Sequence, residues 1–286
     1  AFVPSVLYLV WIRNTEKHSR EPYGMLLKVF AYGAVLSVIF AIGLELILAT
    51  LFDQNIERVY EYLGENPSIP MLVLACVIAP FVEELTKALG VLRVKKRRML
   101  VELENGIVYG AAAGLGFAAT ENLLYESTSY LTDGMEAFVV TAALRSLSSV
   151  LLHATASALV GLGIARSALQ GKSWLPYYLG AVVLHGGYNF AASFGSVYYD
   201  TLGDSAYLIG LTAAFAIALI GVGVMRVVVA VGVRVCVGEG DAVGREHVVR
   251  RVLDQLVGRG RDVNVSPVSD HRLLVFSGRT VIDRVD

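Results

Sequence analysis

The sequence predicts an all-α polytopic membrane protein with about seven transmembrane helices and a small cytoplasmic α+β appendage at its C-terminal end. Composition gives the first reason. Hydrophobic residues make up 55% of the 286 residues, charged residues make up 17%, and the mean hydropathy is +0.60. These values are too apolar for a soluble globular domain of this length. The second reason is that long apolar runs recur along the chain.

Six of these runs are long enough to cross roughly 30 Å of hydrocarbon. They cover residues 29–52, 70–92, 106–125, 137–166, 174–195 and 206–232. Residues 1–12 are too few to cross alone, but Trp11 is typical of an interfacial anchor, so we expect this segment to belong to another span. Together the runs predict a transmembrane domain over residues 1–232.

Charge in the connecting segments predicts the orientation of the spans. Lysine and arginine gather in three segments, at residues 13–28, 93–98 and 166–172. The alternating segments are acidic or poor in cations, at residues 53–65, 126–136 and 195–205. Because cytoplasmic loops carry the excess of Lys and Arg, we expect the cation-rich segments and the C-terminal tail to lie on the cytoplasmic side of the cell membrane.

Residues 233–286 have a different pattern, which predicts a small separate domain. Residues 234–237 and 272–276 are typical of short strands, and residues 245–257 are typical of an amphipathic helix. The segment holds no catalytic motif, so we interpret it as a regulatory, docking or stabilising element. The formal net charge of −1 gives no basic excess, and nucleic acid is therefore not expected as a partner.

The run at residues 70–92 contains Glu83, Glu84 and Lys87. Each ionisable group at bilayer depth costs about 2.5 to 3.5 kcal/mol on insertion scales and needs an explanation. Lys87 follows Glu83 by four residues and Glu84 by three, so it can pair with either carboxylate. Lys87 could instead extend to the cytoplasmic surface, and the glutamates could form a structural ion pair. Two carboxylates against one lysine favour a functional site, and Pro80 predicts a kink that admits water or a substrate strand.

Three other spans also contain polar residues, namely Glu121, His153, and His185 with Asn189. Taken singly, Glu121 could be an interfacial residue, and each histidine could form a hydrogen bond between helices. Asn189 lies four residues after His185 and is expected to orient its ring. Because none of these groups can face lipid at low cost, we expect them to converge with the glutamates inside the bundle. Glycines at four-residue spacing in 106–125 predict a helix-packing face.

Glutamate and histidine together can supply the activated water, the polarised carbonyl and the proton that peptide hydrolysis needs. Two mechanisms fit. In the first, Glu121 and both histidines bind Zn²⁺ with an open fourth position, and Glu84 is the general base. In the second there is no metal, Glu84 or Glu83 activates water directly, and the histidines with Asn189 stabilise the oxyanion. Spacing does not separate the two, because the ligands come from different helices.

The ordered motifs resemble those of the PrsW family of intramembrane proteases. Residues 83–87 match its EExxK motif, residues 117–121 its FxxxE motif, and His153 with residues 185–189 its later His and HxxxN motifs. The resemblance covers roughly residues 70–195 and extends to a wider superfamily with the CAAX prenyl endopeptidases and the scaffold subunit of γ-secretase. It implies cleavage of a membrane-anchored regulator, such as an anti-sigma factor, that releases a signal to the cytoplasm.

Two functions of other classes are alternatives to intramembrane proteolysis. A proton- or ion-coupled transporter also places acids and histidines in the membrane, but the two halves of this sequence show no internal repeat. A catalytically inactive scaffold has no need to keep charged groups in lipid. The sequence therefore predicts an intramembrane endopeptidase that acts in the lipid bilayer on a membrane-anchored protein.

Overall fold

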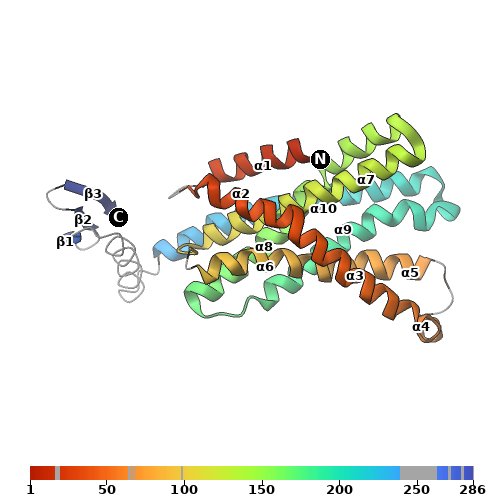
Figure 1. The fold of residues 1–286 in the computed structure, drawn as a ribbon, viewed down its shortest axis with the longest axis horizontal. Helices are drawn as coiled ribbons and strands as arrows, with labels where there is room; N and C mark the ends of the chain where they lie inside the picture. The colour runs from red at the N-terminus through yellow and green to blue at the C-terminus, as the bar shows by residue number, and fades with distance from the viewer. Residues whose placement is uncertain are drawn as a thin grey trace. The chain divides into compact units, whose positions relative to one another are not determined.

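The structure is a computed structural model that describes residues 1–16, 20–63, 66, 68–97, 99–238, 263–269, 272–277 and 280–285. The chain forms two compact units, Ala1–Val231 and Gly232–Asp286. The first unit is a bundle of long helices (Figure 1). The helices in chain order are α1 (Phe2–Asn14), α2 (Tyr23–Ala31), the π-helix η1 (Tyr32–Ser37), α3 (Val38–Asp53), α4 (Ile56–Leu63), α5 (Ser68–Val73), the π-helix η2 (Leu74–Ile78), α6 (Ala79–Lys96), α7 (Leu103–Leu147), α8 (Ser149–Gln170), α9 (Leu175–Leu202) and α10 (Asp204–Gly238).

Among the described residues, 4 helical stretches are long and apolar enough to cross a membrane. They are Tyr23–Asp53, Ser68–Lys96, Leu103–Gln170 and Asp204–Arg226. The predicted helical membrane fold is therefore confirmed, and the protein is an integral membrane protein. The count of about seven spans stays a prediction. Helix α1 has only 13 residues, and α9, with 28 residues, is not among the four stretches.

The stretch Leu103–Gln170 folds back on itself, as Figure 1 shows for α7. Gly134 interrupts the helix with φ 83° and ψ −166°, a conformation that glycine adopts without steric cost. Beyond it, Thr141 forms a hydrogen bond of 2.9 Å with Ser129 through their hydroxyl groups. In one straight helix these two residues would lie roughly 18 Å apart. Helix α7 therefore consists of two antiparallel arms, and the second arm leads into α8.

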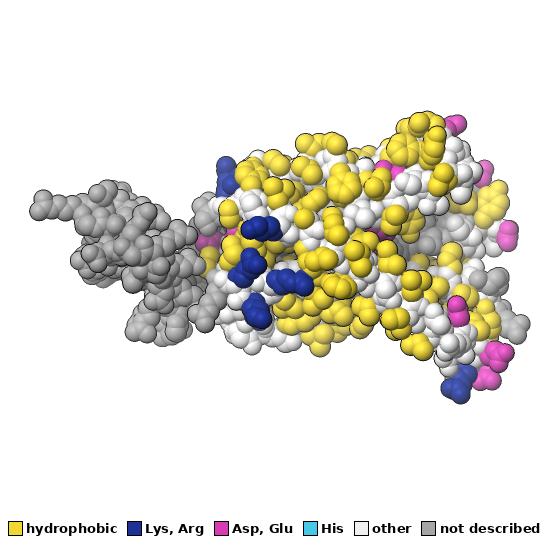
Figure 2. All heavy atoms as spheres, in the orientation of Figure 1, with side chains coloured by type: hydrophobic (Ala, Val, Ile, Leu, Met, Phe, Trp, Pro, Cys, Tyr) yellow, Lys and Arg dark blue, Asp and Glu magenta, His cyan; other side chains and the backbone are white. Residues whose placement is uncertain are grey.

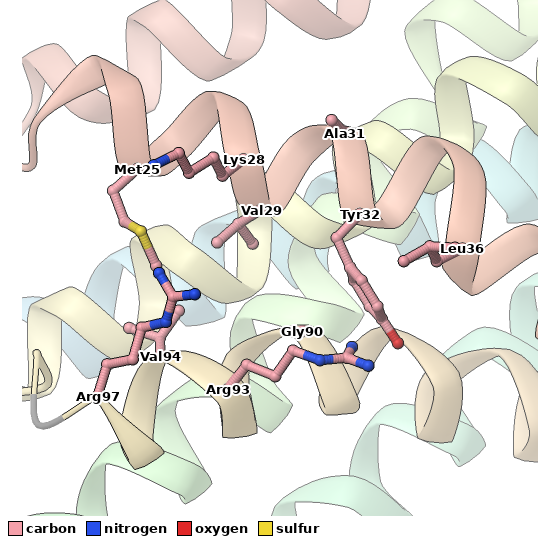
Figure 3. A pocket seen from close by; sticks show the side chains of 10 residues that line it. All are labelled: Met25, Lys28, Val29, Ala31, Tyr32, Leu36, Gly90, Arg93, Val94 and Arg97. Carbon is pink, nitrogen blue, oxygen red and sulfur yellow. The ribbon is translucent and has the colours of Figure 1, made fainter.

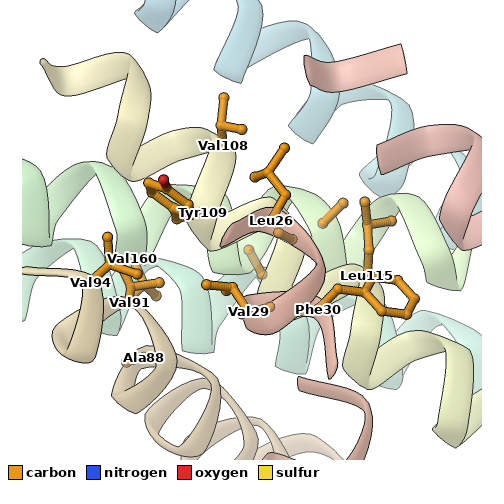
Figure 4. Packing of buried hydrophobic residues seen from close by; sticks show 14 of the residues in the cluster. Leu26, Val29, Phe30, Ala88, Val91, Val94, Val108, Tyr109, Leu115 and Val160 are labelled. Atoms are coloured by element: carbon orange, nitrogen blue, oxygen red, sulfur yellow. The ribbon is translucent and has the colours of Figure 1, made fainter. Parts of the chain in front are cut away.

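The first arm of α7 packs against α8 in the centre of the bundle. Three glycines of this arm lie on the contact, namely Gly106, Gly110 and Gly114. A methyl group added at any of them would lie within 2.3 Å of a backbone oxygen of α8. The predicted helix-packing face is thus confirmed, since only glycine permits so close a backbone approach. Apolar side chains fill the space beside this pair, and Figure 4 shows Leu26, Val29 and Phe30 of α2 together with residues of α6 and α7.

The outer surface of the bundle is apolar, as a lipid-facing surface requires. Figure 2 shows hydrophobic side chains across the visible face, with a group of lysines and arginines at one end. Val35, Ile39 and Leu46, for example, are 54%, 59% and 64% exposed. The described part of the bundle therefore has the surface of a membrane protein and a cation-rich end.

The π-helix η2 comes directly before Pro80. In a π-helix, the carbonyl group of Ala75 would accept a hydrogen bond from the backbone amide of residue 80. Residue 80 is a proline and has no amide hydrogen, so this carbonyl is left without its backbone donor. The side-chain amide of Asn189, on α9, donates to this carbonyl at 2.8 Å. The irregular backbone predicted before the glutamates is therefore a π turn whose free carbonyl is satisfied by another helix.

The second unit contains a three-stranded antiparallel sheet in the order β1 (Val263–Ser269), β2 (Arg272–Ser277) and β3 (Thr280–Val285). Strand β2 covers the range predicted at residues 272–276. The strand predicted at residues 234–237 is wrong, because these residues continue α10, which contains no proline and runs to Gly238. The predicted helix at residues 245–257 lies outside the described residues, so the α+β character of the appendage stays a prediction.

Candidate active site

Helix α6 carries Glu83, Glu84 and Lys87 in the interior of the bundle. Glu83 is 6% exposed, whereas Glu84 and Lys87 are fully buried. The Nζ atom of Lys87 lies 3.0 Å from Oε2 of Glu83 and 2.9 Å from Oε1 of Glu84. The aromatic ring of Phe117, on α7, lies 4.0 Å from the same ammonium group. Lys87 therefore holds both carboxylates, and its alternative placement at the cytoplasmic surface is wrong.

His153, on α8, extends this network to two further helices. Its Nδ1 atom lies 2.8 Å from Nζ of Lys87. Because an ammonium group only donates, Nδ1 must be the accepting nitrogen and the ring hydrogen lies on Nε2. Nε2 is 2.6 Å from Oε2 of Glu121 on α7, and Oε1 of Glu121 lies 3.1 Å from a guanidinium nitrogen of Arg145. Glu121 thus fixes the tautomer and the orientation of the His153 ring.

His185, on α9, is held in a similar way from the opposite side. Its Nδ1 atom lies 3.0 Å from Oε1 of Glu84, and the hydroxyl of Ser157 donates to Oε2 of Glu84 at 3.0 Å. Both oxygens of Glu84 are therefore occupied by donors. The Nε2 atom of His185 is left with its lone pair and lies 3.9 Å from Oε2 of Glu83.

Glu83, His153 and His185 meet in one buried group whose ligand atoms all lie within 4.8 Å of one another. The two imidazole rings are perpendicular, at 81°, with centroids 4.8 Å apart. Two imidazoles and a carboxylate are a donor set found in catalytic zinc sites. Each histidine is also backed by a carboxylate on its other nitrogen, an arrangement that orients histidines for metal binding. The side chains present therefore fit a divalent metal ion, with the Lys87 ammonium as a competing cation, because it contacts both Glu83 and the Nδ1 atom of His153.

The structure groups the predicted residues differently from the sequence-based expectation. Glu121, predicted as a metal ligand, is engaged with His153 and Arg145, and Glu83 stands in the donor group instead. The direction of the Glu83 side chain explains why Glu83 takes this place, since its Oε2 atom lies 3.9 Å from a ring nitrogen of both His153 and His185. Glu84, predicted as the general base, has both carboxylate oxygens occupied and no exposed surface.

Asn189 also has a different partner from the predicted one. Its amide donates to the Ala75 carbonyl, while the His185 ring is oriented by Glu84. Gly186 permits the close approach of α9 to η2, because a methyl group added at Gly186 would lie 2.3 Å from the backbone oxygen of Cys76. The motif at residues 185–189 therefore contains one site residue, His185, and two residues, Gly186 and Asn189, that pack α9 against η2.

Two further partners of the site, Arg145 and Ser157, were not predicted. Arg145 donates to Oδ1 of Asn122 at 2.7 Å and packs over the ring of Tyr125 at 3.8 Å, which holds it beside Glu121. An arginine inside an apolar run was the available signal. Ser157 follows His153 by four residues and so lies on the same helix face, a spacing that could have identified it.

Fold and site together define a class: a helical integral membrane protein with a buried carboxylate and imidazole site, suited to hydrolysis within the bilayer. A family model described as PrsW family intramembrane metalloprotease matches residues 21–222. The chain belongs to the PrsW family of intramembrane proteases. The matched region begins well before the motifs and includes α2, η1 and α3.

Curated relatives agree with the family assignment. The chain is 32% identical to Protease PrsW of Clostridioides difficile (strain 630) over 127 residues, which are 44% of this chain and 48% of that protein. It is 32% identical to Protease PrsW of Bacillus subtilis (strain 168) over 194 residues, 65% of this chain and 78% of the relative. Protease PrsW of Geobacillus kaustophilus (strain HTA426) is 29% identical over 194 residues, 65% and 75% of the two chains. The match thus spans about half the length of the first relative, and no solved structure matches.

Proposed function

We propose that this chain is an endopeptidase that hydrolyses peptide bonds of membrane-anchored proteins, with Glu83 as the group that accepts a proton from the attacking water. One observation carries the proposal: Glu83 lies against both imidazole rings and keeps 6% of its surface exposed, while neighbouring Glu84 has none. A general base must be reachable by water and must have a free lone pair. Glu83 meets both conditions better than Glu84.

In this scheme Glu83 takes the proton from water while the water oxygen bonds to the scissile carbonyl carbon. The same carboxyl group then returns the proton to the leaving amine as the peptide bond breaks. The ammonium group of Lys87, 3.0 Å from Glu83, adds positive charge where negative charge develops on the carbonyl oxygen. Glu84 positions Lys87 and His185 and does not itself react.

A divalent metal ion, as the family description implies, would be held by Glu83, His153 and His185. When bound, the ion would supply Lewis-acid polarisation of the carbonyl and a lowered pKa of its water. Zinc is the ion we propose, because a carboxylate with two imidazoles suits it. With the ion bound, Glu83 would be a ligand, and without the ion it would be the general base. Both mechanisms need Glu83, and the metal content of the active protein decides between them.

Elemental analysis of purified protein tests this part of the proposal, combined with cleavage of a single-span reporter in proteoliposomes. We expect cleavage by the wild-type protein, and loss of both zinc and cleavage in a His153→Ala/His185→Ala variant. Active wild-type protein without zinc would select the metal-independent glutamate mechanism. A double variant that cleaved at the wild-type rate would contradict the proposed site. The variant is checked for a native unfolding transition so that misfolding is not mistaken for a lost reaction.

The substrate class, orientation and tail are part of the same proposal. We propose as substrate a membrane-anchored regulator such as an anti-sigma factor, cleaved in the cell membrane. The grouping of lysines and arginines at one end of the described bundle (Figure 2) supports a cytoplasmic placement of that end. Residues 233–286 would then form a cytoplasmic domain with a regulatory or docking role. Accessibility of single cysteines to a membrane-impermeant reagent in cells tests the orientation.

A further inference from the structure

A cavity of about 440 Å³ lies between the segment formed by α2 and η1 and the second half of α6. Figure 3 shows the side chains that line it: Lys28 and Arg97 lie at one end, and Arg93 extends along the groove toward Tyr32. None of the residues placed in the candidate active site lines this cavity. Its volume is within the range of small-molecule sites, and it opens on the outer face of the bundle.

Lys28, Arg93 and Arg97 are the cationic side chains that line the cavity. All three are exposed, and within the described residues none of them forms an ion pair with a carboxylate. Arg93 and Arg97 lie four residues apart and so share one face of α6. The guanidinium group of Arg93 lies 4.5 Å from the ring centroid of Tyr32, which limits its freedom to turn away. Three cations without a counter-charge favour an anion between them.

The rest of the lining includes Val29, Tyr32 and Leu36, which follow one another away from Lys28 in Figure 3. Leu36 is 44% exposed and belongs to the apolar surface that faces lipid. A ligand that fits this arrangement has a negative head group and an apolar chain attached to it. We propose that the groove binds an anionic phospholipid, with its phosphate near Lys28, Arg93 and Arg97 and an acyl chain along Leu36.

This lipid would contact the wall that supports the candidate active site. The hydroxyl of Tyr32 donates to the backbone oxygen of Thr86 at 3.1 Å, and the hydroxyl of Ser37 donates to Oγ1 of Thr86 at 2.9 Å. Thr86 directly precedes Lys87. Gly90 allows the Tyr32 ring to lie against α6, because an added methyl group would be 2.6 Å from that ring. Bound lipid would therefore stabilise the contact between η1 and the part of α6 that carries the site.

The test uses the full purified chain in detergent, titrated with phosphatidylglycerol or with phosphatidylcholine of the same acyl chains. Native mass spectrometry counts the bound lipid, and thermal unfolding measures its effect. We expect phosphatidylglycerol to be retained and to raise the melting temperature, and phosphatidylcholine to do neither. In a Lys28→Gln/Arg97→Gln variant the apparent Kd for phosphatidylglycerol should rise roughly 25-fold, about fivefold for each cation removed.

The matched control is Lys96→Gln/Lys172→Gln, which removes the same charge from the exposed surface outside the groove. It should change the Kd less than twofold, and both double variants should melt like the wild type without lipid. Equal weakening in the two double variants would overturn the proposal, because it would indicate general surface attraction. Equal binding of phosphatidylcholine, or an equal stabilising effect of inorganic phosphate, would also overturn it.

Discussion

The ammonium group of Lys87 lies 2.8 Å from Nδ1 of His153, so that a fully buried cation joins α6 to α8. The same group holds Glu83 and Glu84 on its own helix. One lysine thus pairs with both glutamates and balances one of their two charges, donates to Nδ1 of a site histidine, and connects two elements that are distant in sequence. The stability of the bundle and the geometry of the site depend on this one side chain.

Replacing Lys87 with methionine should therefore destabilise the protein by about 3 to 5 kcal/mol, because two carboxylates lose their buried partner. Reversible denaturant unfolding in detergent measures this change. Lys96→Met is the matched control on the same helix, since Lys96 is exposed, and it should shift the free energy of unfolding by no more than about 0.5 kcal/mol. Equal stability of the two variants would show that Lys87 does not hold the site.

Gly186→Ala should weaken the packing of α9 on η2. The new methyl group would lie 2.3 Å from the backbone oxygen of Cys76, which cannot move aside as a flexible side chain would. Gly187→Ala meets nothing within 4 Å and should be neutral or stabilising by up to about 1 kcal/mol through helix propensity. Thermal unfolding of the pair measures the difference, and a more stable Gly186→Ala than Gly187→Ala would refute the close approach.

Glu121→Gln should reduce cleavage by roughly 10- to 100-fold, because the His153 ring loses the carboxylate that orients it. The rate on a single-span reporter in proteoliposomes is the measurement. Glu136→Gln, an exposed position on the same helix, serves as the control and should cleave normally. Complete loss of a bound metal ion in Glu121→Gln would instead favour the originally predicted role of Glu121 as a ligand.

The segment between α1 and α2 should give the protein a stability that depends on pH. Burial raises the pKa of Glu16 to about 7, and the nearby carboxylates of Glu21 and Glu104 act in the same direction. The folded state then binds more protons than the unfolded state between about pH 4.5 and 7, so stability increases as the pH falls through this range. Burial also raises the pKa of Glu21, whose carboxylate accepts from the Tyr109 hydroxyl.

Melting temperatures of the wild type and Glu16→Gln between pH 5 and 8 test this expectation. The variant should be more stable than the wild type at pH 8 and should show a flatter pH dependence. Some dependence should remain, because Glu21 still titrates. Parallel curves for the two proteins would show that Glu16 is not the group responsible.

Much of the site could be predicted from the sequence because charge in a membrane is expensive. Glu83, Glu84, Lys87, His153 and His185 were all identified as residues that could not face lipid, and the structure brings them together. Their individual partners were harder to predict. A histidine has two nitrogens, and which carboxylate meets which nitrogen depends on the rotation of several helices about their axes.

The position of Asn189 shows the limit most clearly. A spacing of four residues from His185 correctly placed the two side chains on neighbouring turns of α9. The carbonyl of Ala75 lacks a backbone donor because Pro80 follows a π turn. A buried carbonyl needs a donor, and the side-chain amide of Asn189 supplies it. Likewise, the alternating pattern at residues 234–237 is typical of a strand, but these residues extend a long apolar helix that contains no proline.

The most direct test of the central claim is the rate at which Glu83→Gln cleaves a single-span substrate in proteoliposomes. Glutamine keeps the size and polarity of Glu83 but cannot accept the proton from water. The account predicts a rate about 10²- to 10⁴-fold below that of the wild type, in a protein that still shows a cooperative unfolding transition. Cleavage by Glu83→Gln at the wild-type rate would contradict it.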